Sequence, residues 1–561
     1  MNSKKNIMII VGIAVVAFLI TFLGINMTKN IGKSESVIST ENATDRVAKL
    51  LKKVNVSEAE PVKSPVEFNE VSESDELPNI DKNEVTVNNT TSLYVEIFAT
   101  AEKAGKGKDG WLNEVAESFN KQGFEVNGQP VSVRIRNVAS GLGMDYIRTG
   151  KYIPDGYSPS NDFWEKMLEA NGVKMQTVTD RLVSNTPGIL LSKDTNKTLM
   201  DKYGSINLQT VVEATSNGEF VMGYTNPYAS ATGMNFLIST LKTYDPSNPL
   251  SDTAIEGFQN FQKNVPFVAY TTLQMRDAAE SGTLDGFILE YQTYINDPEL
   301  ARKYVFTPFG YDHKNPLYAP EGLSNEKVEI LSKFADYAAQ DTWQKKATDY
   351  GFNSVQDYVC ELSDVDGSTL IQAQEIWKTE KDSGKPIIAV FVADVSGSMD
   401  GEPLNALKLS LINGMQYIGK KNYVGLVSYS NDVTVNVPVG KFDLNQMSLF
   451  KGAVENLSAS GGTATFDAIV VATDMLQKAQ AQYPDAKTMM FVLSDGQSNR
   501  GLSLSDVSNV LESLKIPVYT IGYNADIEAL GKISAINEAA SINADSDDVV
   551  YKLKNLFNSS L

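Results

Sequence analysis

Three oxygen-bearing side chains stand at alternate positions in the run DVSGSM, directly after the apolar stretch Ile387–Val392. They are Asp394, Ser396 and Ser398. The apolar stretch is typical of a buried strand, and ligands of open α/β sheets bind at the carboxyl ends of the strands. Hard divalent cations such as Mg²⁺ prefer oxygen ligands and retain bound water. The run therefore predicts a metal site, provided that other segments supply further oxygens.

Two later segments supply those oxygens. Thr463 lies in GGTATFDAI, and Asp495 follows the apolar run Met489–Leu493 in SDGQSN. Each piece alone is ordinary turn chemistry, because Asp-Gly and Gly-Gly pairs are common in turns. Taken in this order, the three pieces resemble the von Willebrand factor type A (VWA) domain and its metal-ion-dependent adhesion site.

This resemblance implies a role for each motif residue. Ser396, Ser398 and Thr463 would touch the metal directly, whereas Asp394 and Asp495 would act mostly through waters. Mg²⁺ is the expected ion, although oxygen ligands also suit Mn²⁺ and Ca²⁺. A cation held by neutral hydroxyls and waters keeps its positive charge. It could therefore bind a carboxylate of a partner protein as a remaining ligand.

The segments between the motifs alternate between predicted helices and strands. Leu404–Ile418 has apolar residues at helical spacing. The β-like runs Tyr423–Tyr429 and Val433–Val439 flank a predicted hairpin turn at Ser430, Asn431 and Asp432. Later elements are expected at Met447–Leu457, Thr465–Gln480, Leu504–Leu514, Pro517–Tyr523 and near Asp548–Phe557. This alternation predicts a doubly wound, Rossmann-like α/β fold for residues 379–561.

Residues 92–378 show a different pattern, in which strands end in small-residue loops that open helices. Such loops follow Leu93–Phe98, Val131–Arg136 and Phe220–Thr225. Free backbone N–H groups at helix N-termini bind anions and polar solutes, although the same loops are also ordinary helix caps. The order of the elements, with a crossing into a second lobe near Leu190, resembles a two-lobed bacterial extracellular solute-binding protein of the periplasmic-binding-protein type.

By this resemblance a small polar solute or an oxyanion would lie between the two lobes. Hydroxyl groups would dominate the binding residues, which are Thr100, Ser140, Ser158 and Ser160 on one lobe, Ser230 and Thr232 on the other, and Tyr291 near the cleft. The block could instead have lost its ligand and serve only as a structural platform.

Composition limits the remaining possibilities. The chain of 561 residues has a net charge of −20, which disfavours nucleic acid as a partner. Its only cysteine, Cys360, excludes an internal disulfide, and its only histidine, His313, excludes a His-cluster metal site. His313 lies in the polar stretch Gly310–Pro316, so we expect a solvated loop position. No phosphate-loop motif occurs, and we expect a binding protein and not an enzyme.

The N-terminal residues predict a membrane segment. Ile7–Ile25 is an uncharged and almost wholly apolar stretch of 19 residues, long enough to cross a bilayer as a helix. Its length favours an uncleaved signal anchor at residues 1–26 over a cleaved signal peptide, which would give a secreted protein. Residues 27–91 are polar, so we expect a flexible tether with a short helix at Arg46–Val54.

Together these features predict a membrane-anchored binding protein whose body is extracellular or periplasmic. A solute-binding module and a metal-dependent module would meet near Leu370–Lys378, where any relay between them would have to pass. The alternative is an accessory subunit that recruits substrate to an ATPase-driven assembly, because domains that resemble this one also occur there. A cytoplasmic body with an ATPase partner would favour that alternative.

Overall fold

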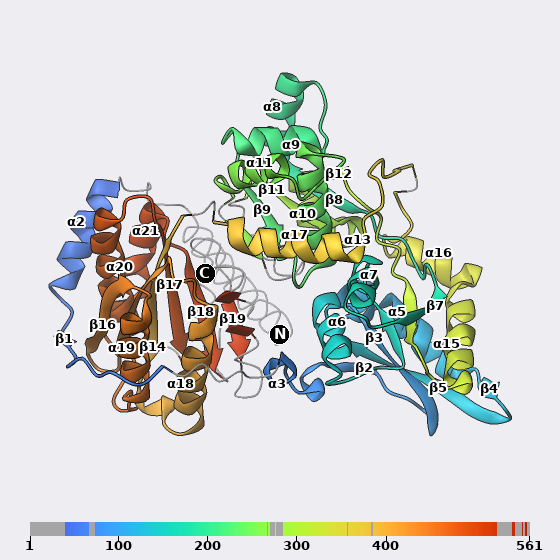
Figure 1. Ribbon diagram of the computed structural model, residues 1–561, viewed down its shortest axis with the longest axis horizontal. Coiled ribbons are helices and arrows are strands. Elements are labelled where there is room, and N and C mark those ends of the chain that lie inside the picture. Colours follow the sequence, from blue (N-terminus) through green and yellow to red (C-terminus); the bar gives the residue numbers. More distant parts are fainter. Residues whose placement is uncertain are drawn as a thin grey trace, which may run out of the picture.

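The computed structural model describes residues 40–66 and 73–523, apart from 266, 270–274, 276–283, 356, 383–384 and 497, together with 541–544, 552–553 and 556–557. These residues form a C-terminal α/β body and a middle α/β body of two lobes, with one sheet in the C-terminal body and one in each lobe (Figure 1). The expected membrane segment Ile7–Ile25 lies outside the described residues. Among the helices that the structure does describe, none is long and apolar enough to cross a bilayer.

The C-terminal body is a seven-stranded sheet. In spatial order its strands are β1 (Val56–Glu58), β16 (Val433–Lys441), β15 (Tyr423–Tyr429), β14 (Ile387–Asp394), β17 (Lys487–Ser494), β18 (Val518–Tyr523) and β19 (Ser541–Ala544). Neighbouring strands are parallel, except that β15 and β16 form an antiparallel hairpin across the predicted turn. Strand β14 is central, and all of its residues are buried.

Helices cover both faces of this sheet, which confirms the doubly wound prediction. They are α18 (Glu402–Gly414), α19 (Leu444–Glu455), α20 (Thr465–Gln482) and α21 (Leu504–Leu514). Alternate residues of β14 enter two separate hydrophobic cores, because side chains alternate between the faces of a strand. Phe391 packs with residues of α18 and α19, whereas Val392 packs with residues of α20 and α21. The segment expected near Asp548–Phe557 lies mostly outside the described residues.

Residues 40–66, part of the segment expected to be a flexible tether, are folded onto this body in the structure. Helix α2 (Thr40–Leu51) buries Val47 and Leu50 in the core beneath α20 and α21. Strand β1 then pairs with the edge strand β16, and the backbone N–H of Ser64 donates to the carbonyl of Ser448 at 3.1 Å. The apolar residues here are too sparse to form a core of their own. They suffice because the sheet offers an existing apolar surface and an unpaired edge.

The middle body has two lobes, and the first contains the larger sheet. Its strands are, in spatial order, β2 (Val85–Val87), β5 (Gln129–Asn137), β3 (Leu93–Ala99), β6 (Gly156–Ser158), β13 (Leu317–Pro320) and β7 (Met175–Thr179), with β4 (Glu125–Val126) paired to β5. The helices around it are α4 (Ala101–Ala104), α5 (Trp111–Lys121), α6 (Ser140–Thr149), α7 (Phe163–Ala170), α15 (Asn325–Ala338) and α16 (Asp341–Asp349).

A buried arginine holds the end of the N-terminal segment on this lobe. Arg136 on β5 forms an ion pair with Glu96 on β3, with Nε and Oε1 2.5 Å apart. Its Nη1 donates to the carbonyls of Ile80 and Asn83 at 3.0 and 2.9 Å. The polar residues before β3 are therefore ordered by contacts with the lobe, as residues 40–66 are by contacts with the C-terminal body.

The second lobe is a five-stranded sheet of β10 (Phe267–Ala269), β9 (Met222–Thr225), β11 (Gly286–Glu290), β8 (Pro187–Ser192) and β12 (Tyr304–Pro308). Its helices are α8 (Lys193–Tyr203), α9 (Leu208–Ser216), α10 (Ala231–Tyr244), α11 (Asp252–Gln262), α13 (Tyr291–Asn296) and α14 (Pro298–Lys303). The chain passes between the lobes twice, before β8 and after β12. The two crossing segments pair through an antiparallel bridge between Asn185 and His313.

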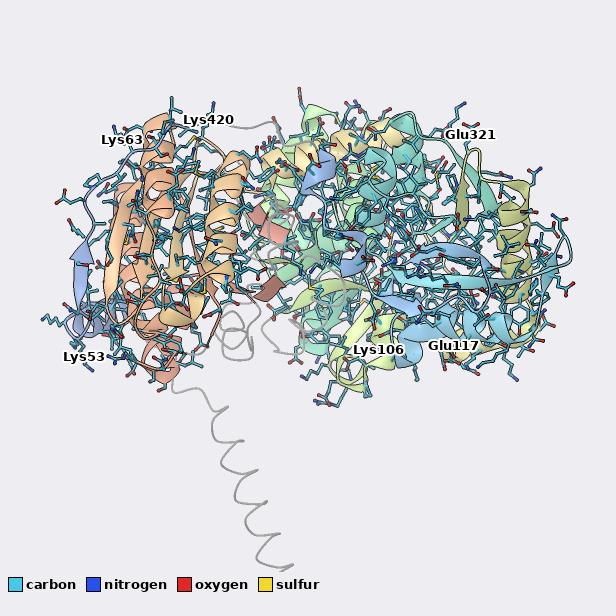
Figure 2. The ribbon with its side chains drawn as sticks, turned by 90° about the horizontal axis from the view of Figure 1, so that it is seen from below. Lys53, Lys63, Lys106, Glu117, Glu321 and Lys420 are labelled. Carbon is cyan, nitrogen blue, oxygen red and sulfur yellow. The ribbon has the colours of Figure 1, made fainter. Side chains whose placement is uncertain are left out.

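One long helix leads from the middle body to the C-terminal body. Helix α17 (Gly367–Glu380) lies along α7 of the first lobe and along α10 and α11 of the second (Figure 1). The side chain of Gln374 donates to the carbonyl of Pro227 at 2.9 Å. In the view from below, Lys53 and Lys63 lie with the C-terminal body, well apart from Glu321 on the first lobe (Figure 2).

Candidate metal site and solute cleft

The candidate metal site begins where β14 ends. Asp394 is fully buried, and both of its carboxylate oxygens accept hydrogen bonds. Oδ1 accepts from the backbone N–H of Ser396 at 2.8 Å, and Oδ2 accepts from the hydroxyl of Ser494 at 2.5 Å. Ser494 is the last residue of the neighbouring strand β17, so the parallel pairing of β14 and β17 fixes the orientation of this carboxylate.

Three predicted ligands form a continuous row of oxygens next to Asp394. The hydroxyls of Ser396 and Ser398 are 3.1 Å apart, and the hydroxyl of Ser398 donates to Oδ1 of Asp495 at 2.9 Å. Ser396 is buried, whereas Ser398 is exposed and Asp495 is half-buried. The row therefore runs from the sheet to the surface, where a partner could reach it.

Thr463 lies on a loop that is clamped between the other two motif loops. The carbonyl of Gly461 accepts from the backbone N–H of Gly397 at 3.0 Å. The backbone N–H of Thr463 donates to Oδ1 of Asn499 at 2.9 Å, and the backbone N–H of Asn499 donates to the carbonyl of Thr463 at 3.0 Å. All three motif segments thus meet at one edge of the sheet. Sequence reasoning missed Ser494 and Asn499, which hold the motif residues in place.

The charges at this edge suit a hard cation. Burial raises the pKa of Asp394, hydrogen bonds from Ser494 and Ser396 lower it, and the charge of Asp495 raises it. The predicted donors are two carboxylates and three hydroxyls, an oxygen-only set that fits Mg²⁺ better than a soft metal. In the part of the chain that the structure describes, no group of three or more His, Cys, Asp or Glu side chains could hold a metal. A site here would therefore depend on the hydroxyls.

The candidate solute residues of the first lobe come together at the ends of β3 and β6. The hydroxyls of Thr100 and Ser160 are 3.4 Å apart, and the hydroxyl of Ser140 accepts from the backbone N–H of Ser160 at 3.3 Å. Ser158 is buried, and its hydroxyl has no hydrogen-bond partner. The structure therefore places all four residues within one buried polar cluster or beside it.

The candidate residues of the second lobe have more varied surroundings. Ser230 caps α10 by accepting from the backbone N–H of Gly233 at 3.3 Å, which is an ordinary structural role. The hydroxyl of Thr232 donates to Oε1 of Glu290 at the end of β11. Tyr291 packs its ring against Tyr294 and Phe306. Whether any of these residues touches a solute stays a prediction.

Sequence reasoning missed three buried ionisable residues near the interface between the lobes. The expectation of a solvated His313 is wrong, because its side chain is completely buried in the crossing segment. Its Nε2 lies 3.2 Å from Nδ2 of Asn235, and its Nδ1 lies 3.6 Å from Oε1 of Glu290. Lys103, one turn after Thr100, is also fully buried. His313 is buried because the two crossing segments pair, and Lys103 because it contacts Asn315 of one of them. Neither contact is visible in local sequence patterns.

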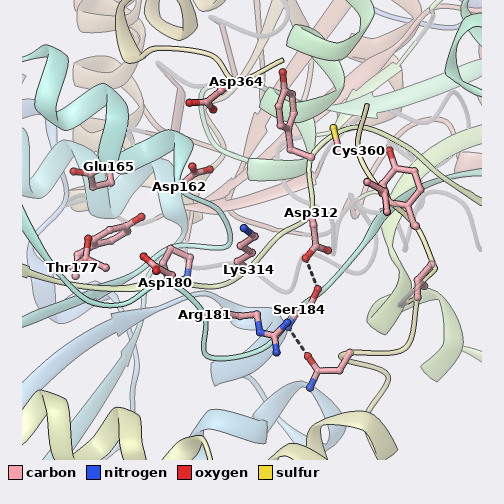
Figure 3. Close-up of a pocket in the computed structure, with 17 residues that line it drawn as sticks. Asp162, Glu165, Thr177, Asp180, Arg181, Ser184, Asp312, Lys314, Cys360 and Asp364 are labelled. Carbon is pink, nitrogen blue, oxygen red and sulfur yellow. Dashed lines mark hydrogen bonds between the residues drawn. The ribbon is translucent and has the colours of Figure 1, made fainter. Parts of the chain in front are cut away.

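A cavity of about 930 Å³ lies next to the crossing segments (Figure 3). Asp312 and Lys314 line this cavity, whereas His313 between them is buried. Side chains of this extended segment therefore alternate between the cavity and the protein interior. Five carboxylates line this cavity, from Asp162, Glu165, Asp180, Asp312 and Asp364. Asp364 pairs with Lys166 at 2.5 Å, and Asp312 accepts from Ser184. None of the described residues around it has a buried polar atom without a hydrogen bond.

Comparison with known families identifies both modules. Residues 389–558 match the von Willebrand factor type A domain, and residues 104–353 match the bacterial extracellular solute-binding protein family. The chain thus combines a solute-binding module with a VWA module.

Curated relatives match through the VWA module. The inter-alpha-trypsin inhibitor heavy chain H3 of Bos taurus is 30% identical over 158 residues, which cover 26% of this chain and 17% of that protein. A von Willebrand factor A domain-containing protein of Dictyostelium discoideum is 28% identical over 172 residues, which cover 29% and 18% of the two chains. The matches therefore span less than a fifth of either relative.

Solved structures resemble each module separately. A periplasmic thiamin binding protein aligns with 52% of this chain and 96% of its own, at 11% identity and a TM-score of 0.38. The sulfate-binding protein SubI of Mycobacterium tuberculosis aligns with 48% and 88%, at 14% identity and 0.35. A von Willebrand factor type A protein of Catenulispora acidiphila aligns with 31% and 42%, at 20% identity and 0.29.

Proposed function

We propose that this protein is an extracellular or periplasmic binding protein, anchored by its N-terminal apolar segment, with two binding modules. The two-lobed module binds a small polar solute. The VWA module holds a divalent cation and captures a partner protein through a carboxylate. The observation that supports this proposal most directly is the row of oxygens formed by Ser396, Ser398 and Asp495 beside the anchored carboxylate of Asp394.

In this proposal each motif residue has a separate task. Ser396, Ser398 and Thr463 hold the cation through neutral hydroxyls, and Asp394 and Asp495 act mostly through waters. Ser494 and the backbone of Ser396 keep Asp394 in one orientation. The bound cation, Mg²⁺ or another oxygen-preferring ion, supplies positive charge that the hydroxyl ligands do not neutralise. The exposed position of Ser398 leaves the site open to a partner carboxylate.

Metal binding can be measured directly with Mn²⁺, whose electron paramagnetic resonance signal distinguishes free from bound ion. We expect the full soluble portion of the chain to bind Mn²⁺, and Ser398→Ala and Thr463→Ala to bind it at least tenfold more weakly. Ser505→Ala is the matched control, because Ser505 is an exposed serine whose hydroxyl contacts only Ser503 among the described residues. Equal Mn²⁺ affinity in all four proteins would refute the metal site.

Partner capture requires a second measurement. Immobilised protein should retain a cell-surface partner in the presence of Mg²⁺ and release it in EDTA, and Asp394→Ala should retain none. Unchanged capture in EDTA would contradict a metal-dependent mechanism even if the metal itself binds.

Localisation separates this proposal from an accessory subunit of a cytoplasmic ATPase. The match to an extracellular solute-binding family supports an extracellular or periplasmic body. Protease added to intact cells, or to cells with a permeabilised outer membrane, should digest the body. Protection until the cytoplasmic membrane is lysed would favour the accessory subunit.

A further inference from the structure

The boundary between the two lobes contains a buried ammonium group without a counter-ion. Nζ of Lys103 donates to Oγ1 of Thr100 and to Oδ1 of Asn315, both at 2.9 Å, and forms no ion pair with any described residue. A lysine ammonium has three donors, so these two neutral acceptors leave one donor over. Burial lowers the pKa of Lys103 to about 7, although the charges of Glu102 and Glu290 act to raise it.

The second lobe contributes a buried carboxylate that is only half satisfied. Oε1 of Glu290 accepts from Thr232 and faces Nδ1 of His313 at 3.6 Å, but Oε2 has no hydrogen-bond partner among the residues that the structure describes. The amide of Asn235 faces Nε2 of His313 as a donor, so a neutral imidazole carries its proton on Nδ1, toward Glu290. Glu290 influences Lys103 electrostatically, yet the two groups are more than the 4.0 Å of an ion pair apart.

The side-chain amides of two asparagines, one after a strand of each lobe, are also buried without a hydrogen-bond partner among the described residues. Nδ2 of Asn161, which follows Ser160 after β6, and Nδ2 of Asn226, which follows β9, form no hydrogen bond with any part of the chain that the structure describes. Both side chains are at most 1% exposed. Leaving a buried polar group without a partner is costly, so native proteins rarely retain several of them unless something binds there.

We propose that the solute of this cleft is a small zwitterion, with an oxyanion that faces Lys103 and the hydroxyls of Thr100 and Ser160, and an ammonium group that faces Glu290. This inference rests on the proposed solute-binding function and adds the class of solute. A plain oxyanion would leave the carboxylate of Glu290 unpaired and repelled, and a plain cation would do the same to Lys103. A molecule with both charges would pair with both residues, which form no ion pair with each other.

Matched pairs of probes test the ammonium group. Taurine and isethionate differ only in an ammonium or hydroxyl group at the end opposite the sulfonate, and β-alanine and 3-hydroxypropionate form the corresponding carboxylate pair. 2-Aminoethylphosphonate and 2-hydroxyethylphosphonate form the phosphonate pair. Calorimetric titration of the full soluble chain should show at least one zwitterion binding tenfold or more tightly than its hydroxyl counterpart. The absence of such a preference in all three pairs would overturn the proposal.

Two substitutions assign the charges to residues. Glu290→Gln should bring the affinities for the two members of the preferred pair to within about threefold, because the favourable charge is lost. Lys103→Met should weaken both members at least tenfold. Lys242→Met is the matched control, since Lys242 is also buried and, among the described residues, donates only to the backbone carbonyl and hydroxyl of Ser363, outside the cluster. A Glu290→Gln protein that is folded by circular dichroism and keeps the wild-type preference would refute the assignment.

These titrations distinguish failure of the zwitterion proposal from failure of the solute-binding function. If probes bind but each hydroxyl compound binds as tightly as its zwitterionic counterpart, the module binds solutes but the zwitterion proposal fails. If none of the six probes binds, the zwitterion proposal also fails, and a wider thermal-shift screen over sugars, amino acids and oxyanions then decides the solute-binding function, since a bound ligand raises stability by mass action.

Discussion

The indole Nε1 of Trp377 donates a hydrogen bond of 2.7 Å to the hydroxyl of Tyr224, and both side chains are fully buried. This contact fixes the end of α17 nearest the VWA module to β9 of the second lobe. At the other end of α17, Gly367 lies against the backbone of α7 in the first lobe. The helix that leads into β14 is therefore attached to both lobes. A change in the angle between the lobes would have to break one attachment or move the helix.

The close approach at Gly367 predicts a large effect of a small substitution. A Cβ atom there would lie 1.9 Å from the carbonyl oxygen of Lys166, and backbone cannot easily give way. Gly367→Ala should push α17 away from α7 and destabilise the middle body by about 1–3 kcal/mol, as overpacking commonly does. Urea unfolding would measure the loss. Ser368 is the exposed neighbour of Gly367, and Ser368→Ala should leave the urea midpoint of unfolding unchanged. Equal urea midpoints for Gly367→Ala and Ser368→Ala would show that α17 does not pack tightly against α7 at Gly367.

Leu50 lies outside the residues that match the VWA family, yet its side chain is buried in the core of the VWA module. We therefore predict that it stabilises this module. Leu50→Ala removes a buried side chain from the core beneath α20 and α21, which typically costs about 2–5 kcal/mol. Lys49→Ala, on the exposed side of the same helix, should change the free energy of unfolding by less than about 0.5 kcal/mol. Denaturant unfolding of both variants tests this contrast. If Leu50→Ala were as mild as Lys49→Ala, the segment would be a detached tether in solution.

Burial of Lys103 predicts a specific pH dependence of stability. Its pKa in the fold is about 7, below its ordinary value of 10.5, because burial disfavours the charged form. Between these two values the unfolded chain holds a proton that the folded chain has released, so this group makes stability rise with pH. This contribution to stability is fully present above pH 10.5. It decreases as the pH falls toward 7, and it is lost below pH 7.

The variant Lys103→Met isolates this contribution from those of other titrating groups. The difference in unfolding free energy between wild type and variant should shift in favour of the wild type as the pH rises from 7 to 9. Glu102, Glu290 and the neutral acceptors Thr100 and Asn315 face the ammonium group and are unchanged in both proteins. A difference that stays constant over this range would show that Lys103 titrates normally.

The anchoring of Asp394 predicts a role for Ser494, which is not among the predicted metal ligands. Ser494→Ala removes the hydroxyl that donates to Oδ2 of Asp394, and such supporting contacts commonly contribute 10–100-fold to metal affinity. We expect Mn²⁺ affinity to fall by about tenfold, with a smaller loss than for Ser398→Ala. Ser494→Thr, which keeps a hydroxyl, should restore part of the affinity. A Ser494→Ala protein with wild-type affinity would mean that the backbone contact from Ser396 suffices to hold Asp394.

The VWA fold and the convergence of its motif segments were predictable because their signals are local. Asp394, Ser396 and Ser398 follow a strongly apolar strand within five residues, and Asp495 follows another. Parallel pairing of those strands then brings the loops together without further information. The hydroxyl cluster of the first lobe was predictable for the same reason, since Thr100 and Ser160 both follow strands of one sheet.

The residues that sequence reasoning missed depend on tertiary contacts. His313 and Asn185 are adjacent only because two crossing segments pair, and the polar residues around His313 read as a loop. Leu50 and Val47 belong to a core whose other residues lie more than 300 positions later in the chain. Local composition predicts that residues 40–66 cannot form a core of their own, but it does not reveal the surface that they cover.

The pairing of β1 with β16 also determines the order in which the molecule can be completed. The hydroxyls of Ser57 and Thr434, which face each other across these strands, are 377 residues apart in the chain. During synthesis β1 emerges long before its partner exists, and contacts of such high sequence separation form slowly. Prior folding of the two-lobed module shortens the effective loop between the strands and lowers the entropic cost of closing it. The middle module is therefore an insertion whose own folding favours closure of the sheet edge that it interrupts in the sequence.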